Sequence, residues 1–325
     1  MKIRILSDLH IDINHKYNLA LNDDVFTLIA GDISGNPEEA IEWVKANVKN
    51  GAFISGNHDV YDTPMTIERV KEKYHNAFPA SSNVTYFDDD VDVVSKEIAP
   101  GILLVADVLY TDYMLCLNPR VDKEHIQERN MQCADPYARF RNGGMNDFRY
   151  GKCEKGYGQA DLDGLGVYRL TPQWYLDHHL KAWDKITRII SENRDKQVIL
   201  MTHHCMSPKC IDNDYLEESS SICASYVSDK EEWLSKQPNL KCIISGHIHC
   251  RKKFNVGNAM YVMNALGYAY EHLFQNNGIC DGKSMMWSPD CILDTDNWTI
   301  AYNEEENPEW RKIYDGFTAF SSIFM

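Results

Sequence analysis

Long apolar runs are missing from this sequence: no stretch reaches about 18 apolar residues, so we expect no helix that spans a membrane. The first residues form a strand-like run without the apolar segment and small-residue cleavage site of a signal peptide. The 325 residues include 10 cysteines but no Cys-x-x-Cys pair, which disfavours a zinc–thiolate site. Together these absences favour reduced thiols and a cytoplasmic location.

Basic residues are also scarce. The chain has 33 Lys and Arg against 48 Asp and Glu, a formal net charge of −15 at pH 7. Proteins that bind duplex nucleic acid usually carry a basic surface, so we expect no such footprint here. Residues 120–155 differ, because eight basic and six acidic side chains give a local balance of +2. A solvated segment of mixed charge is the simpler interpretation, and a surface that holds a nucleic-acid strand is the alternative.

The first part of the chain alternates short apolar runs with helical patterns. Apolar runs predict buried strands at residues 2–6, 25–30 and 52–55. The spacing of apolar residues predicts helices over 37–49 and 65–78. Strands that alternate with helices indicate βαβ units and a largely parallel sheet.

The pattern changes after residue 83. Three closely spaced β-like runs, at 84–87, 91–98 and 102–106, predict a meander that joins or starts a second sheet. Residues 108–172 have no sustained period, and we expect a long insertion that lies across the site as a lid. A helix is expected at 173–193, with His178 and His179 on its surface. Further strands are expected at 198–201, 242–244, 252–256 and 259–263, and a short helix at 229–236.

Polar side chains with metal-binding atoms follow five of these predicted strands. The strand at 2–6 delivers Asp8 and His10, which point the same way because they are two apart on an extended chain. The complete set is Asp8, His10, Asp32, Asn57, His58, His203, His247 and His249. Any one of them after a strand is ordinarily a turn residue, but five strand ends together indicate a site. Oxygen donors combined with several imidazoles suit two divalent transition-metal ions, such as Mn, Fe, Zn, Co or Ni, better than Mg or Ca.

These motifs resemble those of the calcineurin-like metallophosphoesterases. The matching motifs are Asp8-x-His10, Gly31-Asp32-x-x-Gly35, Gly56-Asn57-His58-Asp59, His203 and Gly246-His247-x-His249. The resemblance covers roughly residues 1–107 and 197–271. Three further motifs look like features of a bacterial or phage branch of the family: Tyr110-Thr111-Asp112, Met145-Asn146-Asp147 and Asn264-x-x-Gly267-Tyr268.

The resemblance implies a fold and a division of the chain. The fold would be a four-layer αββα sandwich, an α/β architecture with two central mixed β-sheets and all site loops at one edge. Residues 1–271 would form the metallophosphoesterase domain, whose core comprises 1–107 and 197–271. Residues 108–196 would contribute the insertion and a helix, and 272–325 an extension that packs on the core.

The resemblance also implies a role for each site residue. One metal ion would be held by Asp8, His10, Asp32 and His249. The other would be held by Asp32, Asn57, His203 and His247, so that Asp32 bridges. His58 would serve as general acid with Asp59 as its orienting partner. Contacts with the substrate are expected from Asn57, His58 and His204.

The implied activity is hydrolysis of a phosphomonoester or phosphodiester through in-line attack of a metal-bridging hydroxide. The substrate would be a small molecule, a nucleotide or an oligonucleotide. One alternative is a nuclease or polynucleotide end-processing phosphatase that uses residues 120–155 to hold a strand. Another is a non-catalytic interaction module on the same scaffold. That module predicts decay of the ligand set or of His58, and the sequence shows neither.

Overall fold

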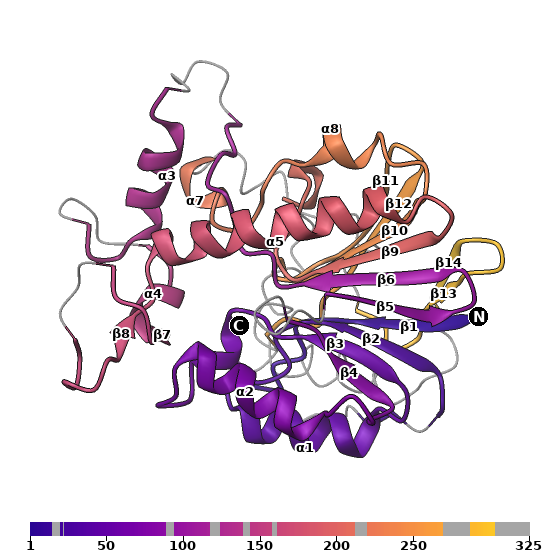
Figure 1. Cartoon of the computed structure of the whole chain (residues 1–325), viewed down its shortest axis with the longest axis horizontal. Helices are drawn as coiled ribbons and strands as arrows, with labels where there is room; N and C mark the ends of the chain where they lie inside the picture. The colour runs from indigo at the N-terminus through magenta and orange to yellow at the C-terminus, as the bar shows by residue number, and fades with distance from the viewer. Residues whose placement is uncertain are drawn as a thin grey trace, which may run out of the picture.

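Two six-stranded sheets form the centre of the molecule. The structure is a computed structural model, and it describes residues 1–14, 20–21, 23–88, 94–117, 124–138, 144–157, 161–211, 220–268 and 287–302. The two sheets lie face to face, and helices cover the outer face of each (Figure 1). Among the described residues, none of the helices combines the length and apolar character needed to cross a membrane.

The first sheet has the strand order β14-β13-β1-β2-β3-β4. Strands β1 to β4 are parallel, while β13 pairs antiparallel with β1 and β14 antiparallel with β13. The bounds are β1 Lys2–Leu6, β2 Phe26–Ala30, β3 Gly51–Ile54, β4 Val84–Tyr86, β13 Cys291–Asp294 and β14 Thr299–Tyr302. The region 272–325 therefore contributes two strands to this sheet, whereas residues 272–286 and 303–325 lie outside the described part of the chain.

The second sheet has the strand order β11-β12-β10-β9-β6-β5. Strands β6, β9, β10 and β12 run parallel, and the edge strands β5 and β11 are antiparallel to their neighbours. The bounds are β5 Ser95–Ala99, β6 Ile102–Asp107, β9 Gln197–Thr202, β10 Leu240–Ser245, β11 Arg251–Val256 and β12 Ala259–Asn264. The meander predicted at 84–106 is wrong in one respect, because β4 pairs parallel with β3 in the first sheet and the second sheet starts at β5.

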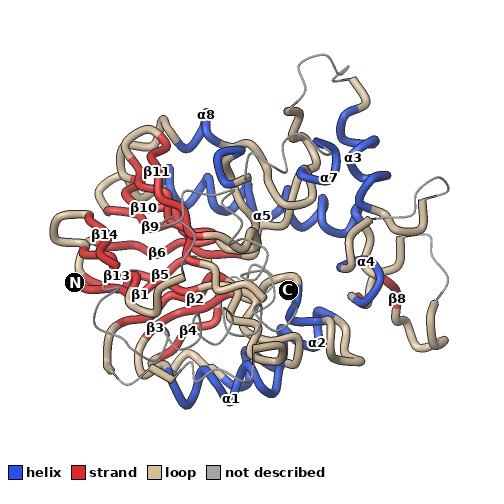
Figure 2. Tube along the Cα trace, turned by 180° about the vertical axis from the view of Figure 1, so that it is seen from behind, coloured by secondary structure: helices blue, strands red, loops and turns tan. Residues whose placement is uncertain are grey.

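The outer layers are helices that begin at polar caps. Helix α1 (Pro37–Asn47) is capped by Asn36, α2 (Ile67–Ala77) by Thr66, and α5 (Pro172–Glu192) by Thr171. In Figures 1 and 2, α1 and α2 cover the first sheet, whereas α5 and α8 (Glu231–Leu234) cover the second. The four-layer αββα sandwich is thereby confirmed.

Three apolar clusters hold these layers together. The inner one joins the facing sides of the sheets through residues such as Ile5, Leu28, Leu104 and Ile199, all fully buried. The other two lie between the sheets and their outer helices. Burial on both faces explains why the central strands read as continuous apolar runs.

The insertion contains regular structure that the sequence did not reveal. Its elements are α3 Ile126–Ala134, α4 Asp147–Tyr150, β7 Lys152–Cys153 and β8 Tyr168–Arg169. They gather at the end of the molecule where α5 begins (Figure 1). Phe148 and Tyr175 are buried with ring centroids 5.0 Å apart, which ties α4 to α5. The alternative of a surface at 120–155 that holds a nucleic-acid strand rests on eight basic residues. Four of them lie outside the described residues: Arg120, Lys123, Arg139 and Arg141.

Candidate metal centre

The site lies where the carboxyl ends of parallel strands from both sheets meet. Strands β1, β2 and β3 of the first sheet are followed by Asp8, Asp32 and Asn57. Strands β9 and β10 of the second sheet are followed by His203 and His247. Parallel pairing aligns these strand ends, so residues far apart in the sequence reach one edge.

Several of these residues adopt a backbone conformation that side chains rarely take. Their φ angles are +52° for Asp8, +43° for His10, +52° for Asp32 and +68° for His247. Such left-handed conformations outside glycine cost about 1–3 kcal/mol each and cluster at functional sites. The strain indicates that these side chains are held in place for a purpose other than stability.

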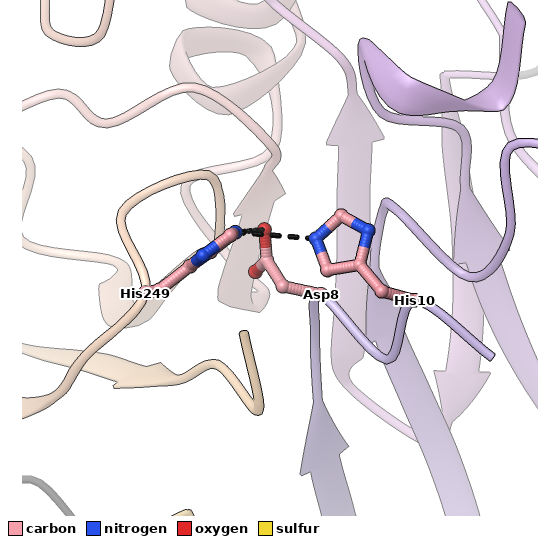
Figure 3. Close-up of side chains that lie close together, drawn as sticks. All are labelled: Asp8, His10 and His249. Atoms are coloured by element: carbon pink, nitrogen blue, oxygen red, sulfur yellow. Dashed lines mark hydrogen bonds and ion pairs between the residues drawn. The ribbon is translucent and has the colours of Figure 1, made fainter. Parts of the chain in front are cut away.

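Asp8, His10 and His249 form the first donor group (Figure 3). The Nε2 atoms of His10 and His249 are 3.1 Å apart, and His249 Nε2 lies 3.6 Å from Asp8 Oδ1. Figure 3 shows the three side chains pointing toward one another, Asp8 and His10 from the end of β1 and His249 from the loop after β10. One ligand atom from each lies within 4.8 Å of the others, which is compatible with a shared metal ion.

Asp32, His203 and His247 form the second donor group, and Asn57 completes it. His203 Nε2 and His247 Nδ1 are each 2.8 Å from the amide oxygen of Asn57. The Oδ2 atom of Asp32 lies 3.4 Å from His203 Nε2 and 3.9 Å from His10 Nε2. Asp32 is therefore within reach of both groups, as a bridging ligand must be.

The electrostatics of the site are set by burial and by the pairing of Asp32 with His203. Burial lowers the pKa of His10 and His247 well below the usual value, so both rings are neutral and can ligate. Burial opposes ionisation of Asp32, but the adjacent His203 outweighs it and lowers the carboxyl pKa. Burial likewise lowers the pKa of His203, yet Asp32 and Asp8 raise it to about 9. Within the described part of the chain, His10 Nδ1 and His247 Nε2 are buried without a hydrogen-bond partner. This mixture of carboxylate, amide and imidazole donors fits borderline divalent ions.

Two motif glycines leave room for the carboxylates. A Cβ at Gly56 would lie 2.0 Å from Asp32 Oδ1, and a Cβ at Gly246 would lie 2.6 Å from Asp8 Oδ2. No side chain can occupy these positions without moving a donor. The glycines of the two motifs are thus required by the close approach of the loops.

His58 lies beside the donor groups but belongs to neither. Its ring centroid is 4.7 Å from that of His10, and its Nε2 is 2.6 Å from the hydroxyl of Tyr268. Asp59 was predicted to orient His58, but among the described residues no hydrogen bond joins the two. The Asp59 carboxylate instead accepts hydrogen bonds from Gly56 N–H and from the buried Tyr74 hydroxyl. Burial and the charge of Asp32 raise the pKa of Asp59 to about 7. The His58 ring is therefore hydrogen-bonded to the Tyr268 hydroxyl and not to Asp59.

His204 and His179 also differ from expectation. His204 is fully buried and stacks on His247 with centroids 4.3 Å apart. His179, expected on the surface of α5, is fully buried, and its Nδ1 donates to the carbonyl of Leu109 at 2.9 Å. The partner of each histidine comes from another element, which the helical or strand pattern around it does not reveal.

Three residues near the site were assigned no role from the sequence. Asp147 and Tyr268 occur in motifs that were noticed for their resemblance, and those motifs were the available signal. Tyr61 carried no signal. Its ring lies 3.9 Å from the His58 ring, and its hydroxyl donates to Asp147 at 2.7 Å.

Two mixed six-stranded sheets, with carboxylate, amide and imidazole donors gathered at one edge, define the class of metal-dependent phosphoester hydrolases. More narrowly, the chain belongs to the calcineurin-like phosphoesterase family, since a sequence model of that family matches residues 1–251. The resemblance noticed in the motifs is confirmed. No curated protein sequence matches the chain.

A solved structure agrees with this fold. Phosphopantetheinyl hydrolase (PptH) from Mycobacterium tuberculosis is similar with a TM-score of 0.61 and 15% sequence identity, over 85% of this chain and 92% of that chain. A dimetal phosphatase from Danio rerio is similar with a TM-score of 0.42 and 13% identity, over 81% of this chain and 86% of that one. The first likeness supports the fold, and the lower score of the second adds nothing to it.

Proposed function

We propose that this protein hydrolyses phosphate esters at two divalent transition-metal ions. The observation that carries the proposal is the convergence of two donor groups, with Asp32 within reach of both. One ion would be held by Asp8, His10, Asp32 and His249, and the other by Asp32, Asn57, His203 and His247. Two such ions, when bound, supply a water molecule of lowered pKa and positive charge against the phosphoryl oxygens.

The residues of the chain contribute orientation and a proton. We assign His58 as the proton donor to the leaving oxygen, because imidazole is the side chain most often used for that step. Its main-chain N–H donates to Asp32 Oδ1 at 2.8 Å, which fixes the loop beside the donor groups. The hydroxyl of Tyr268 is hydrogen-bonded to His58 Nε2, and this bond fixes the orientation of the His58 ring.

The negative charge of the protein does not oppose an anionic substrate at this place. The formal charge of −15 is spread over 325 residues, whereas two divalent ions would concentrate four positive charges beside the substrate phosphate. Local ions of this kind dominate the field of a site. Asn57 and His58 face this region, and we expect them to contact the phosphate ester.

A panel of substrates on metal-reconstituted protein tests the proposal. It comprises an aryl phosphomonoester, an aryl phosphodiester, cyclic nucleotides and short single-stranded oligonucleotides, each with Mn, Fe, Zn, Co or Ni. We expect hydrolysis of a phosphomonoester or phosphodiester that depends on the added ion and disappears with a chelator. Turnover of oligonucleotides alone would favour the nuclease alternative. No turnover of any ester with any ion would refute the proposal.

A further inference from the structure

Asp147 reaches the metal centre from the insertion, about ninety positions away along the sequence. It begins α4, and its side chain is buried. Its Oδ1 accepts hydrogen bonds from Asn57 Nδ2 at 2.7 Å and from the Tyr61 hydroxyl at 2.7 Å. One oxygen of this carboxylate therefore contacts both a proposed metal ligand and the residue packed on His58.

The contact decides which end of the Asn57 amide faces the metal centre. An amide has an oxygen that accepts and an NH2 that donates, and either end fits the same space. An ionised carboxylate oxygen opposite the amide only accepts, so Asn57 turns its NH2 toward Asp147. Its oxygen then points the other way, at 2.8 Å from both His203 Nε2 and His247 Nδ1.

Tyr61 cannot enforce this orientation by itself. Its hydroxyl lies 3.3 Å from Asn57 Nδ2 and both donates and accepts, so without Asp147 it could face either end of the amide. With Asp147 present, the Tyr61 proton is directed to the carboxylate, and its ring stays 3.9 Å from the His58 ring. The same carboxyl oxygen thus orders two residues of the loop after β3.

The position of Asp147 is itself well supported. The next residue, Phe148, is buried against Tyr175 of α5, and the main-chain carbonyl of Asp147 accepts from Gly151 N–H at 2.9 Å. Leu170 N–H in turn donates to the Gly151 carbonyl at 3.0 Å, next to the start of α5. Packing between α4 and α5 is therefore transmitted to the Asn57 amide.

We propose that Asp147 is a positioning residue of the metal centre, which holds the amide oxygen of Asn57 toward the second donor group and, through Tyr61, steadies His58. This inference rests on the proposed function, because it assumes that Asn57 ligates a metal ion. It gives the insertion a part in the site that a covering lid would not have. Groups that orient metal ligands from behind typically change metal affinity by about 10–100-fold when removed.

Metal binding by Asp147→Ala, Asp147→Asn and the wild type tests the proposal. Co²⁺ is titrated into chelator-treated protein, and binding is followed by calorimetry and by the visible absorption of the bound ion. We expect Asp147→Ala to weaken one of two binding events by about 10–100-fold and to leave the other unchanged. Asp147→Asn retains an acceptor oxygen, and because Oδ2 has no hydrogen-bond partner among the described residues, we expect it to recover most of the affinity.

Two control variants separate positioning from general damage. Tyr61→Phe removes the second donor to Asp147 but leaves Asn57 paired, and we expect it to bind both ions as the wild type does. Asp163→Ala removes an exposed carboxylate of the same insertion and should also bind normally. Thermal unfolding of each variant shows whether the fold is retained.

Three results would overturn the inference. The first is wild-type affinity at both sites in Asp147→Ala. The second is equal weakening of both sites, which would indicate loss of structure. The third is an Asp147→Asn variant as weak as Asp147→Ala, which would show that the charge matters and the orientation does not. A wild-type protein that binds no Co²⁺ at all would instead refute the proposed function, and the inference with it.

Discussion

His179 provides the prediction whose size follows most directly from the structure. The ring is buried between α5 and the turn after β6, where its Nδ1–H donates to the Leu109 carbonyl. Its Nε2 lies 3.9 Å from Asp112 Oδ2, and that carboxylate is already paired with Lys230 Nζ at 2.6 Å. Burial, followed by the charge of Lys230, lowers the pKa of His179 from 6.5 to about 4, although Asp112 opposes the change.

The sign and size of the effect follow from proton linkage. Between pH 6.5 and about 4 the unfolded chain binds a proton at residue 179 that the folded chain excludes. The contribution of His179 to the free energy of unfolding is therefore fully present above pH 6.5, and it decreases as the pH is lowered toward 4. A difference of about 2.5 pKa units is worth about 3.4 kcal/mol, lost at up to about 1.4 kcal/mol per pH unit.

The matched variant is His179→Asn, whose amide nitrogen can replace Nδ1 as the donor to Leu109 but does not titrate. Free energies of unfolding are measured by urea denaturation from pH 7.5 to pH 4 on chelator-treated protein. The other buried histidines contribute equally to both proteins, whatever the sign of their slopes, so the difference between the two curves isolates His179. We expect wild type to lose about 3 kcal/mol more than the variant across this range. Parallel curves would refute the reasoning.

Three further predictions concern the metal centre. Asp32→Ala should lose both ions, because its carboxylate is within reach of both groups, and elemental analysis measures the loss. His58→Ala should retain both ions and lose about 10²–10⁴-fold in rate on an alkyl ester, but far less on a nitrophenyl ester, whose leaving group needs no proton. As the comparison for His58→Ala, His203→Ala should lose metal and both activities together. Gly56→Ala should weaken metal binding and destabilise the fold by about 1–3 kcal/mol, since its Cβ would displace Asp32.

Each of these has an outcome that contradicts it. Full metal content in Asp32→Ala would exclude a bridging role. A His58→Ala protein that drops an ion, or slows both esters equally, would exclude the acid role. Wild-type metal affinity and stability in Gly56→Ala would mean that the loops carrying Gly56 and Asp32 can move apart with little loss of folding free energy.

The sequence predicted the central strands and the donor residues at their ends. Buried parallel strands are continuous apolar runs, and β1 to β3, β9 and β10 were each found within one or two residues of their observed bounds. Because such strands end in loops at one edge, their order in the chain was enough to bring the donors together. The local sequence pattern was therefore enough to predict the donors that follow the strands of the two sheets.

Contacts between distant elements were not predictable in this way. The pairing of β13 with β1 joins residues almost three hundred apart, and no periodicity in 291–294 indicates which strand it meets. The Asp147 contact with Asn57 depends on how α4 packs on α5 through Phe148. His179 sits at a helical position whose burial is decided by the turn after β6. In each case tertiary packing, and not local pattern, sets the result.

The carboxylates of the site have a second role that explains how it is formed. Asp8, at the end of the first sheet, accepts the main-chain N–H of His247 from the second sheet at 2.9 Å. Asp32 likewise accepts the main-chain N–H of His58 from the next loop. These hydrogen bonds join the site loops through the donor groups themselves, so each carboxylate orders the backbone that carries other donors. Local strain at Asp8 and Asp32 is thus offset by contacts between loops, and the same hydrogen bonds hold the donors of different loops beside one another.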